Sequence, residues 1–320
     1  MRLFRIAVTG LLAALMFAEG LASAVAALVA QAGRIAPRPD MLAHFAPFWL
    51  IGAAVVVAYG LLLAPRAMRT IFLTVGGVGV VASTALILPE LTRPMSPRAP
   101  ADAPHQIKLI QFNVWASNLE IDRTAQWIAD QDADIVILEE ARPAIRDAVL
   151  KRHPYNVVCK TCSVVIFSKA KATETDVPSE VQHGPRPSMA RATFQDEAGD
   201  YTVLGLHYTW PTADGMQQAQ GRMVSNVLNR LPKERMILTG DFNSTPWSFS
   251  RRREDAMFGL ERRTKALFSW PAYLGAKVPF PFLPIDHVYA GKGWRTVSVK
   301  RGPRLGSDHY PVIVTLARAL

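Results

Sequence analysis

Cysteine is scarce in this sequence, which has only Cys159 and Cys162 among its 320 residues. Two thiolates are too few for a structural zinc site unless histidines complete the ligand set. A thioredoxin-like redox motif should open a helix, whereas CKTC runs directly into the strand-like sequence SVVIF. A local disulfide between the two cysteines stays open as an interpretation, and it depends on whether this region faces an oxidising compartment.

Internal repeats of solenoid period and heptad runs are both absent from the sequence, which excludes repeat arrays and long coiled coils. Acidic residues are rare at the start, because the segment up to Pro104 contains four Asp or Glu and eight Arg. The remainder therefore carries 28 basic and 22 acidic residues, a net charge of +6. This charge is too small to define a polyanionic partner by itself. The uneven composition divides the chain into two parts.

Lysine and arginine are missing from three long apolar stretches, approximately residues 6–30, 45–64 and 71–89. Each stretch is close to the ~20 residues that a helix needs to cross a ~30 Å hydrocarbon layer. We therefore predict an anchor of three transmembrane helices over residues 1–90. The first stretch also resembles a cleavable signal peptide, with small residues at Ala22-Ser23-Ala24, but the two further stretches favour a multi-pass anchor.

Arginines at the ends of these stretches predict an orientation in the membrane. Arg66 and Arg69 lie in the short loop between the second and third stretches, on the same side as Arg2 and Arg5. Because basic residues concentrate on the cytoplasmic side, we expect a cytoplasmic N-terminus in the inner (plasma) membrane. Three crossings then place the rest of the chain on the periplasmic or extracellular side. Residues 91–104 contain four prolines and are predicted to form a linker.

From residue 105 onward, strand-like and helix-like patterns alternate. KLIQFNV and DIVILEE read as buried strands, and DRTAQWIADQD and AIRDAVLKR read as helices. Later segments are mostly strands, with one further helix: SVVIFSK, MARATFQ, YTVLGLHYT, RMILTGDFN, IDHVYA, RTVSVKR and YPVIVTLA, and the helix MQQAQGRMVSNVLNRL. Residues 105–320 are therefore predicted to form one α/β domain with two sheets and helices on their outer faces.

Polar side chains stand at the ends of these predicted strands. A single Asp or Asn after a strand is more often a turn residue or a helix cap than a catalytic group. As a set, however, they supply carboxylates for a hard cation such as Mg²⁺ or Mn²⁺, and imidazoles for phosphate chemistry. The set consists of Asn113, Glu140, His207, Asp241, Asn243, Asp286, Asp308 and His309.

The motifs FNV, LEE, LHYTWP, LTGDFNSTP, IDHVY and GSDHYPV occur in this order, and the sequence resembles the endonuclease/exonuclease/phosphatase superfamily with the deoxyribonuclease I-like fold over roughly residues 105–320. The resemblance implies a four-layered α/β sandwich of two packed β-sheets. It also implies a metal-dependent hydrolase that cleaves phosphodiester or phosphomonoester bonds by in-line attack of water. Nucleic acid and phospholipid head groups are the leading substrates, and no protein partner is inferred.

The resemblance makes Glu140 the main metal-binding carboxylate, with Asn113 beside it and Asp308 supporting the metal. Glu139 is not expected to be a ligand. The family places its acid at the end of a leucine-x-Glu run, and strand alternation is expected to turn Glu139 to the opposite face.

The same resemblance gives roles to the remaining motif residues. Asp241 would orient or deprotonate the attacking water, and Asn243 would donate hydrogen bonds to the phosphate. His309 would contact the phosphoryl oxygens and be oriented by Asp286. His207 would bind a phosphate oxygen or serve the leaving group. A histidine at this position resembles the nuclease, sphingomyelinase and inositol-phosphatase branches more than the abasic-site repair enzymes, which use a tyrosine.

Another class of protein gives a second interpretation, a catalytically silent binding module of the same fold on a membrane anchor. The chemically competent side chains at all six motifs argue against it. The basic run 251–253 is interpreted as a solvated helix face rather than a polyanion site. Trp210 and Trp247 adjoin site motifs and are interpreted either as pocket walls or as packed aromatics.

Overall fold

The computed structural model describes residues 2–178, 187–211 and 215–319, and these residues form two compact units. Unit 1 is built on Met1–Arg93 and also contains the later segment Trp247–Arg252. Unit 2 begins at Pro94 and contains most of the remaining chain.

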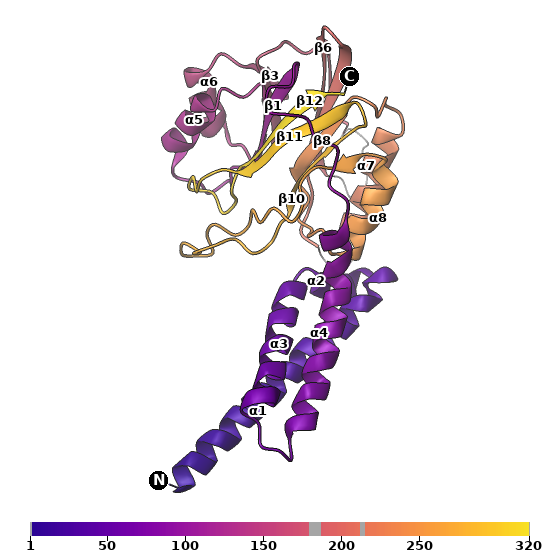
Figure 1. Ribbon diagram of the computed structural model, residues 1–320. Helices are drawn as coiled ribbons and strands as arrows, with labels where there is room; N and C mark the ends of the chain where they lie inside the picture. Colours follow the sequence, from indigo (N-terminus) through magenta and orange to yellow (C-terminus); the bar gives the residue numbers. More distant parts are fainter. Residues whose placement is uncertain (1, 179–186, 212–214, 320) are drawn as a thin grey trace. The chain divides into compact units, whose positions relative to one another are not determined.

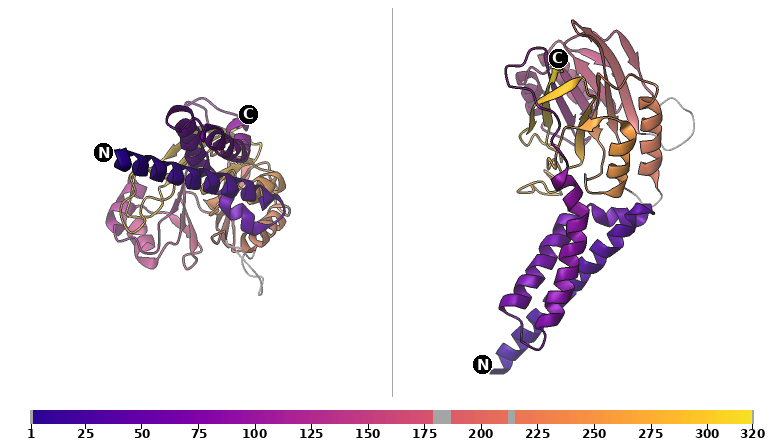
Figure 2. Two further views of the ribbon diagram at one scale, coloured as in Figure 1. Left: turned by 90° about the horizontal axis from the view of Figure 1, so that it is seen from below. Right: turned by 45° about the vertical axis from the view of Figure 1, so that its right-hand side comes forward.

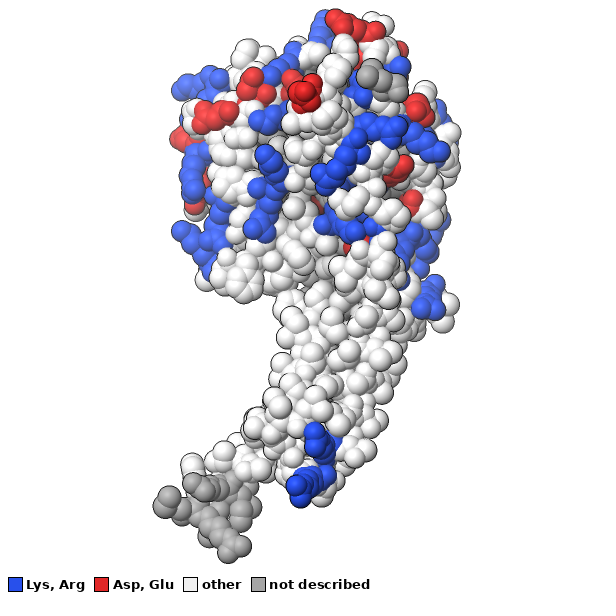
Figure 3. Space-filling model, viewed as in Figure 1, with Lys and Arg blue, Asp and Glu red and all other residues white. Residues whose placement is uncertain are grey.

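Unit 1 is a small helical bundle. Its helices are α1 (Arg2–Ala30), the short 3-10 helix η1 (Gln31–Arg34), α2 (Pro37–Ala43), α3 (Ala46–Leu62) and α4 (Arg69–Thr92). Small residues let these helices approach closely, since a Cβ added at Gly76 of α4 would lie 3.0 Å from the Ala53 carbonyl oxygen of α3. The face of the bundle seen in Figure 3 carries few charged residues along its length, apart from basic side chains at one end.

Two helices of unit 1 are long and apolar enough to cross a membrane, over Ala7–Arg34 and Arg69–Leu91. The second predicted span corresponds to α3, whose 17 residues extend only about 26 Å at 1.5 Å per residue. Helices α2 and α3 pass the same test together, but only as a pair bent by 59°. Two of the three predicted spans therefore pass this test alone, and the middle stretch supplies a third only if α2 and α3 form one bent span.

Asp40 of α2 connects two distant segments within unit 1. Its carboxylate accepts hydrogen bonds from the backbone N–H groups of Phe249 at 2.7 Å and Ser250 at 2.8 Å, and from Ser250 Oγ at 2.7 Å. These N–H groups belong to the first turn of α8 (Phe249–Phe258), where a helix has unpaired donors and favours a negative charge. Asp40 therefore serves as an N-terminal cap for a helix more than two hundred residues further along the chain.

The rest of this segment is also packed rather than solvated. Trp247 is buried, and its Nε1 donates to the His44 carbonyl oxygen at 3.0 Å, so Trp247 is a packed aromatic. Arg251 is completely buried, which makes the interpretation of residues 251–253 as a solvated helix face wrong for this residue. Charge patterning could not reveal this burial, because the covering residues come from the N-terminal helices.

Two six-stranded mixed sheets form the centre of unit 2 (Figures 1 and 2). Sheet A has the order β11-β12-β1-β2-β4-β3, and sheet B has the order β5-β6-β7-β8-β10-β9. The strands are β1 (Gln106–Asn113), β2 (Ile135–Glu139), β3 (Asn156–Val158), β4 (Val164–Ser168), β5 (Glu174–Asp176), β6 (Ser188–Asp196), β7 (Gly199–His207), β8 (Met236–Asp241), β9 (Glu261–Arg262), β10 (Asp286–Ala290), β11 (Trp294–Arg301) and β12 (Val312–Arg318).

The sheets pack face to face, and helices cover their outer faces (Figure 1). One buried cluster lies between the sheets and includes Leu109 and Ile137 of sheet A with Val203 and Val288 of sheet B. A second cluster joins sheet A to α5 (Ile121–Asp130) and α6 (Pro143–Arg152), and a third joins sheet B to α7 (Met216–Leu228) and α8. The predicted four-layered α/β sandwich is therefore confirmed.

Strand alternation explains these layers, because successive side chains of β1 point to opposite faces. Leu109 faces sheet B, while Ile110 and Phe112 face the helices. The alternation is broken at the strand end, where Glu140 has a positive φ of 54°. This turn redirects the side chain, which has consequences for the site.

The segment before β1 is bound to sheet A rather than extended throughout. α4 continues to Thr92, and Ser96 Oγ already lies 3.1 Å from Thr296 Oγ1 of β11. The Ala99 N–H donates to the Thr296 carbonyl oxygen at 3.1 Å.

Further along the chain, Cys159 and Cys162 form a disulfide, which is the local pairing that the sequence left open.

Candidate active site

Strand register brings three of the predicted residues into one row across sheet B. His207 of β7 pairs with Asp241 of β8, and Asp241 pairs with Asp286 of β10. Residues that pair directly across neighbouring strands have side chains close together. A Cβ at Gly240 would clash with the Leu206 carbonyl oxygen, so the close approach of β7 and β8 beside the row requires glycine there.

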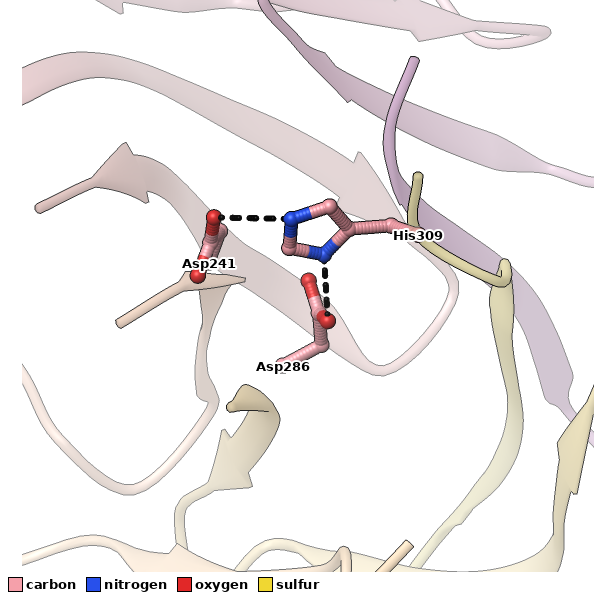
Figure 4. Close-up of side chains that lie close together, drawn as sticks. All are labelled: Asp241, Asp286 and His309. Carbon is pink, nitrogen blue, oxygen red and sulfur yellow. Dashed lines mark hydrogen bonds and ion pairs between the residues drawn. The ribbon is translucent and has the colours of Figure 1, made fainter. Parts of the chain in front are cut away.

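His309 lies between two carboxylates of this row (Figure 4). Its Nδ1 is 2.9 Å from Asp286 Oδ2, and its Nε2 is 3.5 Å from Asp241 Oδ2. All three side chains are almost completely buried. The Ser307 hydroxyl fixes the turn that carries the imidazole, because Ser307 Oγ accepts from the His309 N–H at 3.0 Å and donates to the Asn113 carbonyl oxygen at 2.7 Å.

The electrostatics of this group favour a charged imidazole. Burial lowers the pKa of His309, but the charges of Asp286 and Asp241 and the hydrogen bond to Asp286 outweigh burial and raise the pKa to about 10. Burial raises the pKa of Asp241 to about 6, although the His309 and His207 imidazoles oppose this shift. Above that pH the site therefore contains an ionised Asp241 beside a protonated His309.

Sheet A contributes Asn113 and Glu140 to the same place. The Asn113 Nδ2 group donates to Glu140 Oε1 at 3.0 Å and to Asp241 Oδ2 at 3.1 Å, so it links the two sheets. Burial raises the pKa of Glu140, but hydrogen bonds from the Ala116 N–H and Asn113, with the His207 and His309 imidazoles, hold it below its ordinary value. Glu140 is therefore ionised at neutral pH.

His207 and Asn243 border this group. His207 Nε2 lies 3.6 Å from Asp241 Oδ2 and 3.9 Å from Glu140 Oε1, so it faces both carboxylates. The Asn243 N–H donates to Asp241 Oδ1 at 2.8 Å, and its Nδ2 donates to the Tyr208 carbonyl oxygen at 2.9 Å. Asn243 Oδ1 is buried and has no hydrogen-bond partner among the described residues. The structure thus brings seven predicted residues together.

The donor set fits a hard divalent cation at Glu140. Its side chain is 28% exposed, whereas that of Asp241 is 1% exposed, so Glu140 has room for a cation that keeps several waters. Asp241, Asp286 and His309 also offer ligand atoms within 4.8 Å of one another. His309 Nδ1 is already at hydrogen-bonding distance from Asp286, and Mg²⁺ prefers oxygen ligands, so this group fits a hydrogen-bonded triad better than a magnesium site.

Asp308 has a different environment from the other predicted ligands. Its Oδ2 accepts a hydrogen bond from Trp270 Nε1 at 3.1 Å, while its Oδ1 is buried and has no partner among residues 2–178, 187–211 and 215–319. The second oxygen is suited to a cation or an ordered water. Trp210 is half exposed and packs edge-on against Trp270, with 5.5 Å between ring centroids.

Glu139 lies in the network around this site. It faces sheet B and accepts a hydrogen bond at 3.0 Å from Gln111 Nε2, which also donates to Asp286 Oδ1 at 2.8 Å. Burial and the charges of Asp286 and Asp241 raise the pKa of Glu139 well above its ordinary value. The expectation that Glu139 points away is wrong, because the positive φ of Glu140 turns that residue, and not Glu139, out of the alternating pattern.

Gln111 is the residue of this network that sequence reasoning missed. A signal was available, since Gln111 stands two positions before Asn113 in β1 and therefore shares its face. Its two donated hydrogen bonds, to Glu139 and Asp286, fix the carboxylate that orients His309.

Two packed mixed sheets with acidic and imidazole groups at adjoining strand ends define a class of α/β-sandwich proteins whose members hydrolyse phosphoesters. The sequence profile described as "Endonuclease/Exonuclease/phosphatase family" matches residues 110–309. The chain belongs to this family. A comparison with curated proteins finds no match.

Solved structures share the fold at low sequence identity. An endonuclease/exonuclease/phosphatase family protein from Bacteroides thetaiotaomicron is 17% identical, with a TM-score of 0.56 and coverage of 68% of this chain and 99% of that chain. A family protein from Bacteroides vulgatus is 15% identical, with a TM-score of 0.57 and coverage of 68% and 100%. A mannosyl-6-phosphatase from Bacteroides thetaiotaomicron is 16% identical, with a TM-score of 0.54 and coverage of 66% and 99%.

Proposed function

We propose that this chain is a membrane-anchored, divalent-metal-dependent phosphoester hydrolase in which Asp241 prepares water for in-line attack on phosphorus. The observation that carries the proposal is the buried arrangement of His309 between Asp286 and Asp241, with Glu140 and Asn113 adjoining Asp241. Phosphoester hydrolysis needs a group for the water, positive charge for the phosphoryl oxygens and support for the leaving oxygen. These residues supply all three.

Each side chain has a task that follows from its charge. Ionised Asp241 orients or deprotonates the water, and protonated His309, held by Asp286, donates to a phosphoryl oxygen. Asn243 donates to the phosphate, and His207 binds a phosphate oxygen or serves the leaving group. Mg²⁺ or Mn²⁺ would be held by Glu140, with Asn113 and Asp308 as the further predicted ligands. A bound cation would neutralise phosphoryl charge as a Lewis acid.

The proposed substrate is a phosphodiester, either in a nucleic acid or in a phospholipid head group. A phosphomonoester is the alternative. The mannosyl-6-phosphatase supports the wider range, because its name describes a phosphomonoesterase built on the same fold. The apolar helices of unit 1 support membrane attachment. We further propose an inner-membrane location with residues 1–90 as the anchor, 91–104 as the linker and 105–320 as the hydrolase domain on the periplasmic or extracellular side, which requires the bent pair of α2 and α3 to complete a third crossing. Membrane attachment favours substrates at the bilayer.

Purified full-length chain, assayed with Mg²⁺, Mn²⁺ or EDTA, tests the proposal. The panel comprises DNA, RNA, sphingomyelin, phosphatidyl lipids, inositol phosphates and a sugar phosphate, with Asp241→Asn as the inactive control. We expect metal-dependent hydrolysis of at least one substrate that Asp241→Asn abolishes. The absence of hydrolysis across the panel would instead favour a silent binding module, and activity that survives in Asp241→Asn would show that the assigned site is wrong.

A further inference from the structure

The loop of residues 271–284, here called the apolar loop, joins Trp270 to β10 and extends away from the sheets as a long orange-yellow segment (Figure 1). It contains no Asp or Glu, and Lys277 is its one basic residue. Its large side chains at Leu274 and Phe280 are 54% and 70% exposed. A single exposed apolar side chain is ordinary, but two on one projecting loop mark an interaction surface.

The apolar loop is held in this conformation by its own backbone. The Leu274 N–H donates to the Ala276 carbonyl oxygen at 2.9 Å, and the Val278 N–H donates to the Ala272 carbonyl oxygen at 3.1 Å. Gly275 occupies the turn with a φ of 67°, where an L side chain would be strained. The exposure of Leu274 is therefore fixed by an ordered turn.

The base of the apolar loop contacts the proposed active site. The Ala272 N–H donates to the Asp308 carbonyl oxygen at 2.6 Å, and Trp270 Nε1 donates to the Asp308 carboxylate at 3.1 Å. Asp308 directly precedes His309 in the chain. The base of the loop is therefore hydrogen-bonded to the residue that precedes His309.

Two cations lie beside the apolar loop. Arg304 donates to the carbonyl oxygen of Val278 in the loop, and Arg301 donates at 3.0 Å to the carbonyl oxygen of Phe268, three residues before the loop begins. Exposed apolar side chains flanked by cations are the combination that binds an anionic bilayer surface.

The chain itself limits which surfaces the apolar loop can meet. Thr92 ends α4, one of the two helices apolar enough to cross a membrane, and Ser96 is already bonded to Thr296 of sheet A. The four peptide units between Thr92 and Ser96 extend about 14 Å at most. An inserted α4 would therefore keep unit 2 close to the lipid head groups.

We propose that the apolar loop inserts Leu274 and Phe280 into the head-group boundary of an anionic bilayer and so brings lipid head-group phosphoesters to the site. The inserted side chains bury apolar surface, while Lys277, Arg301 and Arg304 contact anionic head groups. This inference rests on the proposed membrane anchoring and, for delivery of substrate, on the proposed hydrolysis. It selects the phospholipid head group from the proposed substrate classes.

Depth measurements test the insertion without any need for activity. Full-length Phe280→Cys carries a nitroxide label in nanodiscs of phosphatidylglycerol and phosphatidylethanolamine, and Met257→Cys on α8, 38% exposed in the native protein, is the matched control. We expect the label at 280 to be more accessible to oxygen than to a water-soluble nickel complex, and the label at 257 to show the reverse. A water-like label at 280 would overturn insertion. A label shielded from both reagents would indicate a protein partner and overturn it as well.

Activity tests the delivery of substrate. In the same nanodiscs we expect Leu274→Glu/Phe280→Glu to lower release of water-soluble phosphate ester from phosphatidylglycerol by about tenfold or more. Hydrolysis of soluble bis(p-nitrophenyl) phosphate should be unchanged, and Met257→Glu should affect neither reaction. Equal lipid hydrolysis by the double variant and the wild type would overturn delivery. If wild type inserts the label but hydrolyses neither substrate, the proposed function fails while insertion stands.

Discussion

Substitution of Asp286 by Asn tests whether Asp286 and His309 act as one unit. The pKa of His309 rises from its ordinary 6.5 to about 10, and the charge of Asp286 is the largest cause of the rise. Each pKa unit corresponds to about 1.36 kcal/mol of preference for the charged imidazole. Removing the charge of Asp286, while retaining its volume, should therefore lower the pKa of His309 by about one unit or more.

The assay is a pH–rate profile of the full-length chain with a soluble phosphodiester at fixed metal concentration. The rate should rise as Asp241 ionises near pH 6 and fall as His309 loses its proton near pH 10. Asp286→Asn should move the falling limb to lower pH. It should also move the rising limb to lower pH, because the charge of Asp286 contributes to the raised pKa of Asp241.

Turnover in a double-mutant cycle completes the test. Asp286→Asn and His309→Ala should each lower turnover by about tenfold to a thousandfold, which is the range for loss of a positioned acid–base group. The double variant should be little worse than His309→Ala alone, because groups with a shared role do not give additive losses. Multiplicative losses with an unmoved basic limb would refute the reasoning and leave Asp286 with a structural role in its strand.

Three further outcomes are expected. Glu140→Gln should abolish most activity and raise the metal concentration needed for the remaining activity. Glu139→Gln should have a mild effect, because the raised pKa of Glu139 already favours a neutral side chain. Equal effects of the two substitutions in metal titrations would contradict this prediction. An alkaline phosphatase fused after Leu320 should be active, as expected of a domain outside the cytosol. If this fusion is inactive while a fluorescent protein fused at the same position fluoresces in the cytosol, the proposed topology is reversed. His309 stabilises the fold fully below its unfolded pKa near 6.5, and thermal melts should show this contribution declining as pH rises towards about 10.

Hydrophobic pattern was sufficient to predict the layers of the sandwich. The alternation that places Leu109 and Ile110 on opposite faces of β1 can be read from the sequence, and so can the polar residues at strand ends. The motif order predicts that Asp241, Asp286 and His309 share one site, and the structure brings them together.

Local irregularities and distant partners could not be predicted in the same way. The direction of Glu140 depends on its own positive φ, which a period-2 pattern does not contain. The apolar stretch at 45–64 has the composition of a span, but its helix α3 covers Ala46–Leu62 and reaches a spanning length only together with α2, across a bend of 59°. Arg251 is buried by residues far away in the chain, which local charge patterning cannot detect.

The cap that Asp40 forms on Ser250 also has a consequence for biosynthesis. These residues are 210 positions apart, so a ribosome that adds about 5–20 residues per second reaches Ser250 some 10–40 s after it has made Asp40. Unit 1 cannot be completed during this interval, even if its helices have already entered the membrane. Cutting the chain at residue 104 would leave unit 1 incomplete permanently. Trp247 and the first turn of α8 would then lack their hydrogen-bond partners, the His44 carbonyl oxygen and the Asp40 carboxylate.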